Sequence, residues 1–176
     1  MSEREVDLAE RARAYRDELD QTFARPRTIV RPAVVSLLAI RVGDAPYALP
    51  VAEIGAVLAD RPMTRMPSPL RELLGLCAVR GAIIPIYDLA PLLGVGPARD
   101  KAPRWLALAK RRELVAIAFD ALEAQVQLPA SEIAGSSGGG TEAVSIHGEL
   151  RPLIRIASVL DAIEQRVTNV TGALGT

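Results

Sequence analysis

The sequence has one cysteine, one histidine and few aromatic side chains. A lone Cys77 cannot form an intramolecular disulfide, so a reducing, cytoplasmic compartment is the expected setting. Cys77 and His147 are also too few to build a metal centre from nitrogen and sulfur ligands. Since 49% of the residues are hydrophobic but only 3% are aromatic, the core must consist mainly of Val, Ile, Leu and Ala.

The chain also lacks net charge and long apolar runs. Its 21 Lys and Arg residues are balanced by 21 acids, so no overall basic field attracts nucleic acid or an anionic membrane. Every apolar run is interrupted well before the roughly 18 residues of a membrane span. The N-terminus mixes acids with arginines, unlike a signal peptide. We therefore expect a cytoplasmic protein with no nucleic-acid partner and no membrane insertion.

No group of residues has the pattern of a catalytic site. General-base catalysis would require His147 to lie beside a nucleophile and an orienting group. Instead it precedes Gly148 in a predicted turn, where a polar residue is expected in any case. Gly138–Gly140 precedes a strand and lacks a following Lys, so it does not match a phosphate-binding loop. Asp88 and Asp120 follow strands, where a carboxylate typically caps the next turn. The sequence predicts a binding module without catalytic residues, cofactor or metal.

One segment of the chain occurs twice. Residues 81–93 align with residues 148–160 at an offset of 67, with a glycine, a proline four positions later and the following apolar positions in common. Upstream, residues 47–54 match residues 115–122 in apolar pattern, at an offset of 68. Two blocks in the same order indicate one small β unit used twice.

The local patterns predict many short strands and few helices. Leu89–Leu93 is a predicted helical turn that ends at Gly94, and Ile156–Val167 is the predicted terminal helix. A further helical turn is expected at residues 51–54. The expected strands are 34–42, 46–50, 56–59, 73–79, 82–88, 104–109, 114–119, 121–127, 143–146 and 149–154. Strands of this length and spacing are typical of small antiparallel barrels.

The N-terminal residues 3–25 have a different pattern. They contain no Gly or Pro, and acids alternate with arginines, which predicts a helix. Its narrow apolar stripe consists of Leu8, Ala12, Tyr15, Leu19 and Phe23. Because so narrow a stripe buries little area, it suits a reversible contact, such as self-association, better than a place in the core. We expect the chain to fold without residues 1–28.

Apolar and turn residues along residues 33–165 follow the order and spacing of a known family. The matching positions are Tyr47-Ala-Leu-Pro-Val51, Ile54, Val57, Thr64-Arg65, Gly75, Val79-Arg80-Gly81, Ile84-Pro85-Ile86, Asp88-Leu89 and Phe119-Asp120-Ala-Leu122. Together they resemble the CheW family of chemotaxis coupling proteins.

The resemblance implies a mainly β fold of two five-stranded SH3-like barrels, with an N-terminal and a C-terminal helix. It suggests a helical extension at residues 1–30, a first barrel at 31–98, and a second barrel with the terminal helix at 99–176. These boundaries are free to interleave. Proteins of this kind join the regulatory domain of a CheA-type histidine kinase to the cytoplasmic tip of a methyl-accepting chemoreceptor. The resemblance thus implies a cytoplasmic adaptor recruited to receptor arrays at the membrane.

The same resemblance implies which residues bind partners. The expected receptor or kinase contacts are Ile54, Val57, Arg65, Gly75, Leu76, Arg80 and Gly81. The residues themselves leave alternatives open. Arg80 is equally suited to pair inside the molecule with Asp88 or Asp120, and Ile54, Val57 and Leu76 are also typical of ordinary core residues.

Two positions depart from the family pattern. Ala56 stands where the family usually has an acid, and Ala78 stands where it often has Asn. These changes suggest an alternative function, a scaffold or decoy that binds a receptor or itself without coupling to a kinase. They also suggest a chemosensory pathway other than flagellar chemotaxis.

Overall fold

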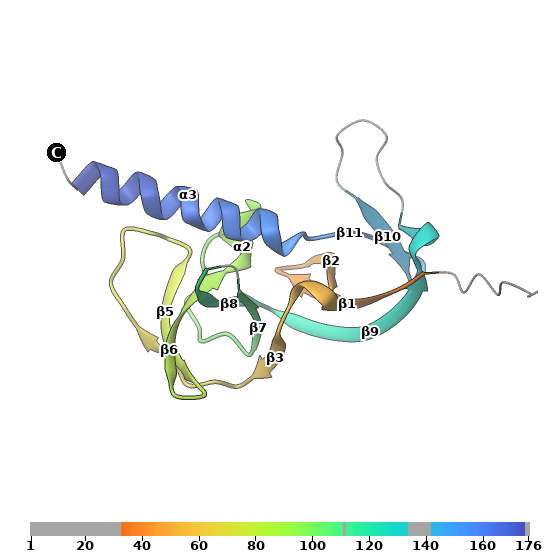
Figure 1. Cartoon of the computed structure of the whole chain (residues 1–176), viewed down its shortest axis with the longest axis horizontal. Helices are drawn as coiled ribbons and strands as arrows, with labels where there is room; N and C mark the ends of the chain where they lie inside the picture. Colours follow the sequence, from red (N-terminus) through yellow and green to blue (C-terminus); the bar gives the residue numbers. More distant parts are fainter. Residues whose placement is uncertain (1–32, 111, 134–141, 175–176) are drawn as a thin grey trace, which may run out of the picture. The chain divides into compact units, whose positions relative to one another are not determined.

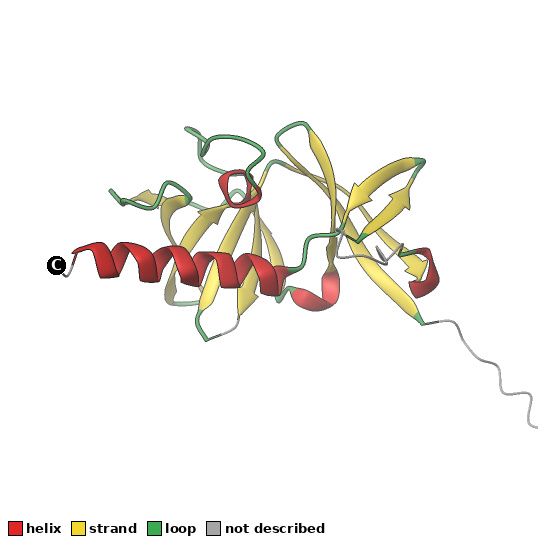
Figure 2. Cartoon of the chain, turned by 90° about the horizontal axis from the view of Figure 1, so that it is seen from above, coloured by secondary structure: helices red, strands yellow, loops and turns green. Residues whose placement is uncertain are grey.

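The computed structural model describes residues 33–110, 112–133 and 142–174, and Figures 1 and 2 show their arrangement. The predicted N-terminal helix, with Leu8, Ala12, Tyr15, Leu19 and Phe23, lies outside the described residues. The strands are β1 (Val34–Val42), β2 (Ala45–Pro50), β3 (Ala56–Ala59), β4 (Thr64–Arg65), β5 (Leu73–Val79), β6 (Ala82–Asp88), β7 (Trp105–Lys110), β8 (Leu114–Phe119), β9 (Ala121–Pro129), β10 (Ala143–Ile146) and β11 (Glu149–Pro152). The helical elements are η1 (Val51–Glu53), α2 (Leu89–Leu93), η2 (Ala130–Glu132) and α3 (Ile156–Leu174).

Six strands form one sheet in the order β3-β7-β8-β6-β5-β4. Adjacent strands in this sheet pair antiparallel, except β6 and β8, which run parallel. Side chains alternate between the two faces, as strand geometry requires. One face carries Leu74, Cys77, Ile84, Leu106 and other buried residues of a single apolar cluster. Both β3 and β5 contribute to this cluster, so the sheet curls around it.

The remaining strands surround a second cluster. β1 lies between β2 and β9, and β10 pairs with β11. Leu37 and Ala39 of β1 pack with Val144 of β10, Ile146 of β10 and Leu153. A parallel bridge between Ala48 and Leu153 joins the end of β11 to β2. Five strands thus enclose a core made of aliphatic side chains.

A third cluster joins the two groups of strands. It contains Ile40 and Leu49 from β1 and β2, and Ala107 and Ile117 from the outer face of the six-stranded sheet. Helix α3 covers this cluster with Ile156, Val159, Leu160 and Ile163, at the helical spacing predicted for them. Figure 2 shows α3 lying along the six-stranded sheet. The helix extends to Leu174, seven residues beyond its predicted end.

Two glycine-containing turns connect the repeated hairpins. Arg80 and Gly81 have φ angles of 49° and 83°, and His147 and Gly148 have φ angles of 53° and 81°. Two successive residues with positive φ are typical of the type I′ turn, whose twist matches that of a hairpin. The offset of 67 is therefore confirmed as a structural repeat, a hairpin followed by a helix, seen once as β5-β6-α2 and once as β10-β11-α3.

The upstream part of the repeat was predicted wrongly. Residues 115–122 turn back from β8 into β9, whereas residues 47–54 continue from β2 into η1. The true counterpart of β2-η1 is β9-η2, since Leu49-Pro50 leads to Glu53-Ile54 as Leu128-Pro129 leads to Glu132-Ile133. Both segments are a strand, a proline and one turn of 3-10 helix.

The mainly β fold and the terminal helix are as predicted, but barrel closure is not seen. The hydrogen-bonded strands of the described residues form three open sheets. Strands of the two predicted ranges, 31–98 and 99–176, also pair with each other: β1 with β9, β3 with β7, and β6 with β8. The subdomain boundaries stay a prediction. Strands from one predicted range pair with strands from the other.

Candidate protein-binding surface

Ile54 and Val57 lie with Trp105 on one face of the β3–β7 pair, here called the η1–β3 face. Val57 pairs with Ala107, and Ala59 pairs with Trp105, so the side chains of Val57 and Trp105 point to the same side. Ile54, Val57 and Trp105 are half-buried and pack against the edge of the central cluster. Each is thus part of the core and part of the surface, which reconciles the two alternatives open for Ile54 and Val57.

The opposite end of the same sheet holds Arg65, Gly75 and Leu76. Arg65 pairs with Gly75 and Thr64 with Leu76, where β4 joins β5. A Cβ atom on Gly75 would lie 2.2 Å from the carbonyl oxygen of Thr64, and the φ angle of Gly75 is 151°. Close approach of two backbones therefore requires glycine at this position. Leu76 is half-buried, and the Arg65 guanidinium is exposed and donates to the carbonyl oxygen of Asp100.

Arg80 and Gly81 form the exposed tip of the β5–β6 hairpin. Within the described residues Arg80 has no ion pair or hydrogen-bond partner. The predicted alternative partners are already bound by Arg99: its Nη2 lies 2.7 Å from Asp88 Oδ1, and its Nη1 lies 3.2 Å from Asp120 Oδ1. Internal pairing of Arg80 with Asp88 or Asp120 is therefore excluded in this conformation.

The outer face of this hairpin is apolar near the tip. Ala78 lies opposite Ile83, and Leu76 lies opposite Pro85. The Ile83 side chain is 74% exposed, the largest exposed fraction among the large hydrophobic residues described. An apolar strand face beside an unpaired guanidinium has the composition of a protein interface.

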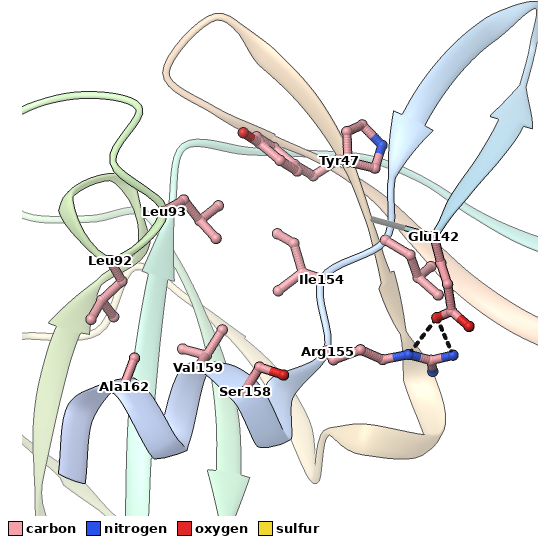
Figure 3. A pocket seen from close by; sticks show the side chains of 11 residues that line it. Tyr47, Leu92, Leu93, Glu142, Ile154, Arg155, Ser158, Val159 and Ala162 are labelled. Carbon is pink, nitrogen blue, oxygen red and sulfur yellow. Dashed lines mark hydrogen bonds and ion pairs between the residues drawn. The ribbon is translucent and has the colours of Figure 1, made fainter. Parts of the chain in front are cut away.

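A groove that the sequence did not predict lies between α2 and the start of α3. Figure 3 shows Leu92 and Leu93 of α2 facing Val159 and Ala162 of α3, with Tyr47 above them. The groove has a volume of about 690 Å³ and a mainly apolar lining. Ile54, Val57 and Leu76, expected to line a groove between barrels, are not part of it. The apolar spacing within 89–93 and 156–163 indicated two helical faces but not that they meet.

An ion pair and a helix cap join η1 to α3. Glu53 Oε2 accepts a 2.7 Å hydrogen bond from the backbone N–H of Ile156, the first residue of α3. Glu53 Oε1 accepts a 2.8 Å bond from Arg155, whose guanidinium also binds Glu142, as Figure 3 shows. The hydrogen bond that Arg155 donates to Glu53 raises the pKa of the Arg155 guanidinium above its ordinary value. Glu53, the residue before Ile54, thus caps the N-terminus of the terminal helix α3.

A second network crosses from β1 and β9 to β11. Arg151 is 4% exposed and pairs with Glu123 and Glu149, and Arg41 pairs with the same two acids. Hydrogen bonds from Arg41 and then Arg151 hold the pKa of the Glu123 carboxyl below its ordinary value of 4.5. These charges stabilise each other, and so they indicate a structural network.

Catalytic and metal-binding geometry does not appear among the described residues. His147 is exposed on a turn, and Cys77 is buried in an apolar cluster, which raises the pKa of its thiol. In residues 33–110, 112–133 and 142–174, no three His, Cys, Asp or Glu side chains are placed to hold a metal ion. Within the same ranges, no helix has the length and apolarity needed to cross a bilayer.

The fold is shared with a known class of proteins. A scaffolding protein, TtCheW from Thermoanaerobacter tengcongensis, superimposes with a TM-score of 0.61 over 70% of this chain and 90% of its own. The sequence identity of 16% makes this a likeness of fold alone.

Sequence comparison then gives the family. A family model described as CheW-like domain matches residues 36–167, and the chain belongs to the CheW family. A probable chemotaxis protein CheW of Rhizobium etli is 34% identical over 87 residues, and a chemotaxis protein CheW of Rhizobium meliloti is 29% identical over 87 residues. Each match covers 49% of this chain and 56% of the relative. CheW-family proteins are scaffold or adaptor proteins of chemotaxis and not enzymes.

Proposed function

We propose that this protein is a non-enzymatic adaptor that couples the cytoplasmic tip of a methyl-accepting chemoreceptor to the regulatory domain of a CheA-type histidine kinase. Membership in the CheW family supports a role in chemosensory signalling. The adaptor acts in the cytoplasm at receptor arrays. In this proposal the six-stranded sheet and the group of five strands correspond to the two SH3-like barrels that the family resemblance implies, and one of them has one strand more than the predicted five.

One observation carries the proposal: Arg80 is presented to solvent with a fixed backbone and no partner within the described residues. Its φ of 49° places it in the left-handed region beside Gly81, and the residue is exposed at the tip of the hairpin. The carboxylates that would neutralise it internally are bound by Arg99. An exposed guanidinium next to apolar Ile83 is suited to bind a carboxylate of a partner.

The predicted partner residues then form two surfaces. Arg80, Gly81 and Leu76 belong to the β5–β6 hairpin, where Gly75 and Arg65 adjoin them. Ile54 and Val57 belong to the η1–β3 face at the other end of the strand order. Two sets of candidate contacts on different strands are compatible with a protein that joins two partners, and they support a coupling role.

A scaffold or decoy without kinase coupling is the second candidate. The observation that favours it is the side chain of Ala56, which packs against the cluster inside the six-stranded sheet. The position at which the family usually has an acid is therefore apolar, and Ala78 adds a second apolar position on the hairpin. Such a protein would bind receptor, or itself through residues 1–30, and leave the kinase uncoupled.

Reconstitution of receptor fragment, kinase and this protein separates the two candidates. A coupler raises kinase autophosphorylation when receptor is present, whereas a decoy lowers it or leaves it unchanged. Pull-down with the isolated regulatory domain tests the kinase contact directly. Absence of binding to both receptor and regulatory domain at tens of micromolar protein would refute the coupling function. The solution mass of the chain with and without residues 1–28 tests self-association.

A further inference from the structure

We propose that Glu53 is a helix cap supplied from outside the helix, through which the first turn of α3 depends on the position of η1. A partner bound at the η1–β3 face then changes the N-terminus of α3 and the groove beside it. Glu53 is thus a positioning residue that connects a candidate binding surface to the terminal helix. The coupling step rests on the proposed function, whereas the cap is tested without a partner.

The two repeated helices begin differently. At the offset of 67, Asp88 before α2 corresponds to Arg155 before α3. Asp88 caps its own helix, since its carboxylate accepts a hydrogen bond from the N–H of Ala90. An arginine side chain has donors only, so Arg155 cannot accept from the free N–H groups at the start of α3. The second helix therefore needs an acceptor from another part of the chain.

Glu53 of η1 supplies this acceptor. Its Oε2 lies 2.7 Å from the backbone nitrogen of Ile156, and its Oε1 lies 2.8 Å from Nη1 of Arg155. Arg155 therefore holds the external cap in place, because its guanidinium pairs with the capping carboxylate. Nε of Arg155 also donates a 2.8 Å bond to Glu142, so two acids orient the guanidinium. The residue that removes the internal cap thus binds the one that replaces it.

The backbone around Glu53 connects this cap to the η1–β3 face. The N–H of Ile54 donates a 3.2 Å bond to the carbonyl oxygen of Val51, which closes the single turn of η1. Glu53 and Ile54 are therefore neighbours in one short, closed turn, and a displacement of Ile54 displaces the Glu53 carboxylate. Just before η1, the carbonyl oxygen of Ala48 accepts a 2.8 Å bond from the N–H of Ile154. The β2–η1 segment thus holds the start of α3 through both backbone and side chain.

The contact is weak enough for a binding event to break it. The side chains of Arg155 and Glu53 are 44% and 25% exposed, so water and salt screen their ion pair. Further along α3, Leu160 and Ile163 are buried in the central cluster and hold the helix without the cap. Loss of the cap therefore loosens only the first turn, where Arg155 and Ser158 line the groove. Binding at η1 and the order of that turn are in this way linked.

A double-mutant cycle in the full chain tests the cap. Glu53→Ala should speed amide hydrogen exchange at residues 156–158 about threefold or more, because the first turn loses its acceptor. Arg155→Asn places a capping side chain at the position equivalent to Asp88, without adding a negative charge beside Glu53. In that background Glu53→Ala should speed the same exchange by less than about 1.5-fold. Glu132→Ala, in the equivalent turn η2, is the control and should leave α3 unchanged.

Equal effects of Glu53→Ala in the two backgrounds, or no effect in the wild type, would overturn the inference. Melting temperatures confirm that the variants are folded. If Arg155→Asn is unfolded, Arg155→Ser, which also introduces a capping side chain, takes its place in the cycle.

The coupling is tested by titrating a purified receptor cytoplasmic fragment into the full chain labelled with nitrogen-15. In the wild type, binding should shift the amide resonance of Ile156. In the double variant Glu53→Ala/Arg155→Asn, which has its cap inside the helix, the fragment should bind and leave the resonances of the first turn unchanged.

Three outcomes contradict the coupling in different ways. Binding to the wild type without a shift at Ile156 would overturn it and leave the proposed function intact. Equal shifts in the wild type and the double variant would show that the fragment contacts α3 directly. If the fragment does not bind, the proposed function and the coupling step fail together, and the double-mutant cycle still decides whether Glu53 is the cap.

Discussion

Arg99 holds the fully buried carboxylate of Asp88 with its backbone N–H and with two guanidinium nitrogens, at 2.9, 3.0 and 2.7 Å. Asp88 also accepts from the N–H of Ala90 and so caps α2. The same guanidinium reaches Asp120 and the carbonyl oxygen of Phe119. One arginine from the segment between β6 and β7 thus fixes the ends of two parallel strands.

Arg99→Ala should therefore lower the free energy of unfolding by about 3–5 kcal/mol, because it leaves a buried carboxylate without its cation. Chemical denaturation measures the change. The double variant Asp88→Asn/Arg99→Ala should recover part of the loss, since no buried charge remains. Arg112→Ala, an exposed position, serves as control. A loss below about 1 kcal/mol for Arg99→Ala would contradict this role.

Gly75→Ala should destabilise the protein by about 2 kcal/mol or more, because the new Cβ would meet the Thr64 carbonyl oxygen at 2.2 Å. Gly81→Ala is the matched control: its φ of 83° imposes strain, but no atom lies within 4 Å of the added Cβ. We expect a loss of about 1–2 kcal/mol there. Equal melting temperatures of Gly75→Ala and the wild type would show that the β4–β5 contact is not needed.

The cap between Glu53 and α3 predicts a smaller effect. Glu53→Gln removes the charge at the helix N-terminus and at Arg155, so stability should fall by about 1 kcal/mol. Thermal unfolding at low ionic strength measures it, with Glu132→Gln in the equivalent turn η2 as control. If the two variants are equally stable, Glu53 is not a cap of energetic importance.

Acid should weaken the network of Arg41, Arg151 and Glu123. The pKa of Glu123 is lower in the folded protein than its ordinary value of 4.5. Its stabilising contribution is therefore complete above that value and is lost as the pH falls through the lower, folded pKa. Glu123→Gln should flatten the decrease in melting temperature below pH 4.5 relative to the wild type. An identical acid profile of the two proteins would contradict this assignment.

Local features were predictable from the sequence, and long-range pairings were not. Arg80-Gly81 and His147-Gly148 lie between apolar runs, so the hairpins and the turn at Gly94 followed from backbone preferences. The pairing of β1 with β9 depends on contacts between distant residues, which no local pattern contains. The predicted match at an offset of 68 was wrong because half-buried strands share the same alternation of apolar residues, so the pattern does not identify which strands are equivalent.

The part of the candidate surface that depends on a local turn was also predictable. The motif marked Arg80 and Gly81, and the turn does present them to solvent. Arg99 was missed because it stands in a Gly- and Pro-containing connector, where nothing indicates a buried partner. Trp105 was missed because a strand residue shows its face only when the partner strand is known.

The most direct test of a receptor-binding role is the affinity of Arg80→Ala for the receptor cytoplasmic fragment, with its melting temperature measured alongside. The account predicts at least a tenfold rise in the dissociation constant, from the loss of a charge-assisted contact of about 1.5–3 kcal/mol, and an unchanged melting temperature. Arg80→Lys should recover only part of the affinity, since an ammonium group cannot bind a carboxylate through two parallel bonds. Wild-type affinity of Arg80→Ala, or a large fall in its melting temperature, would contradict the account.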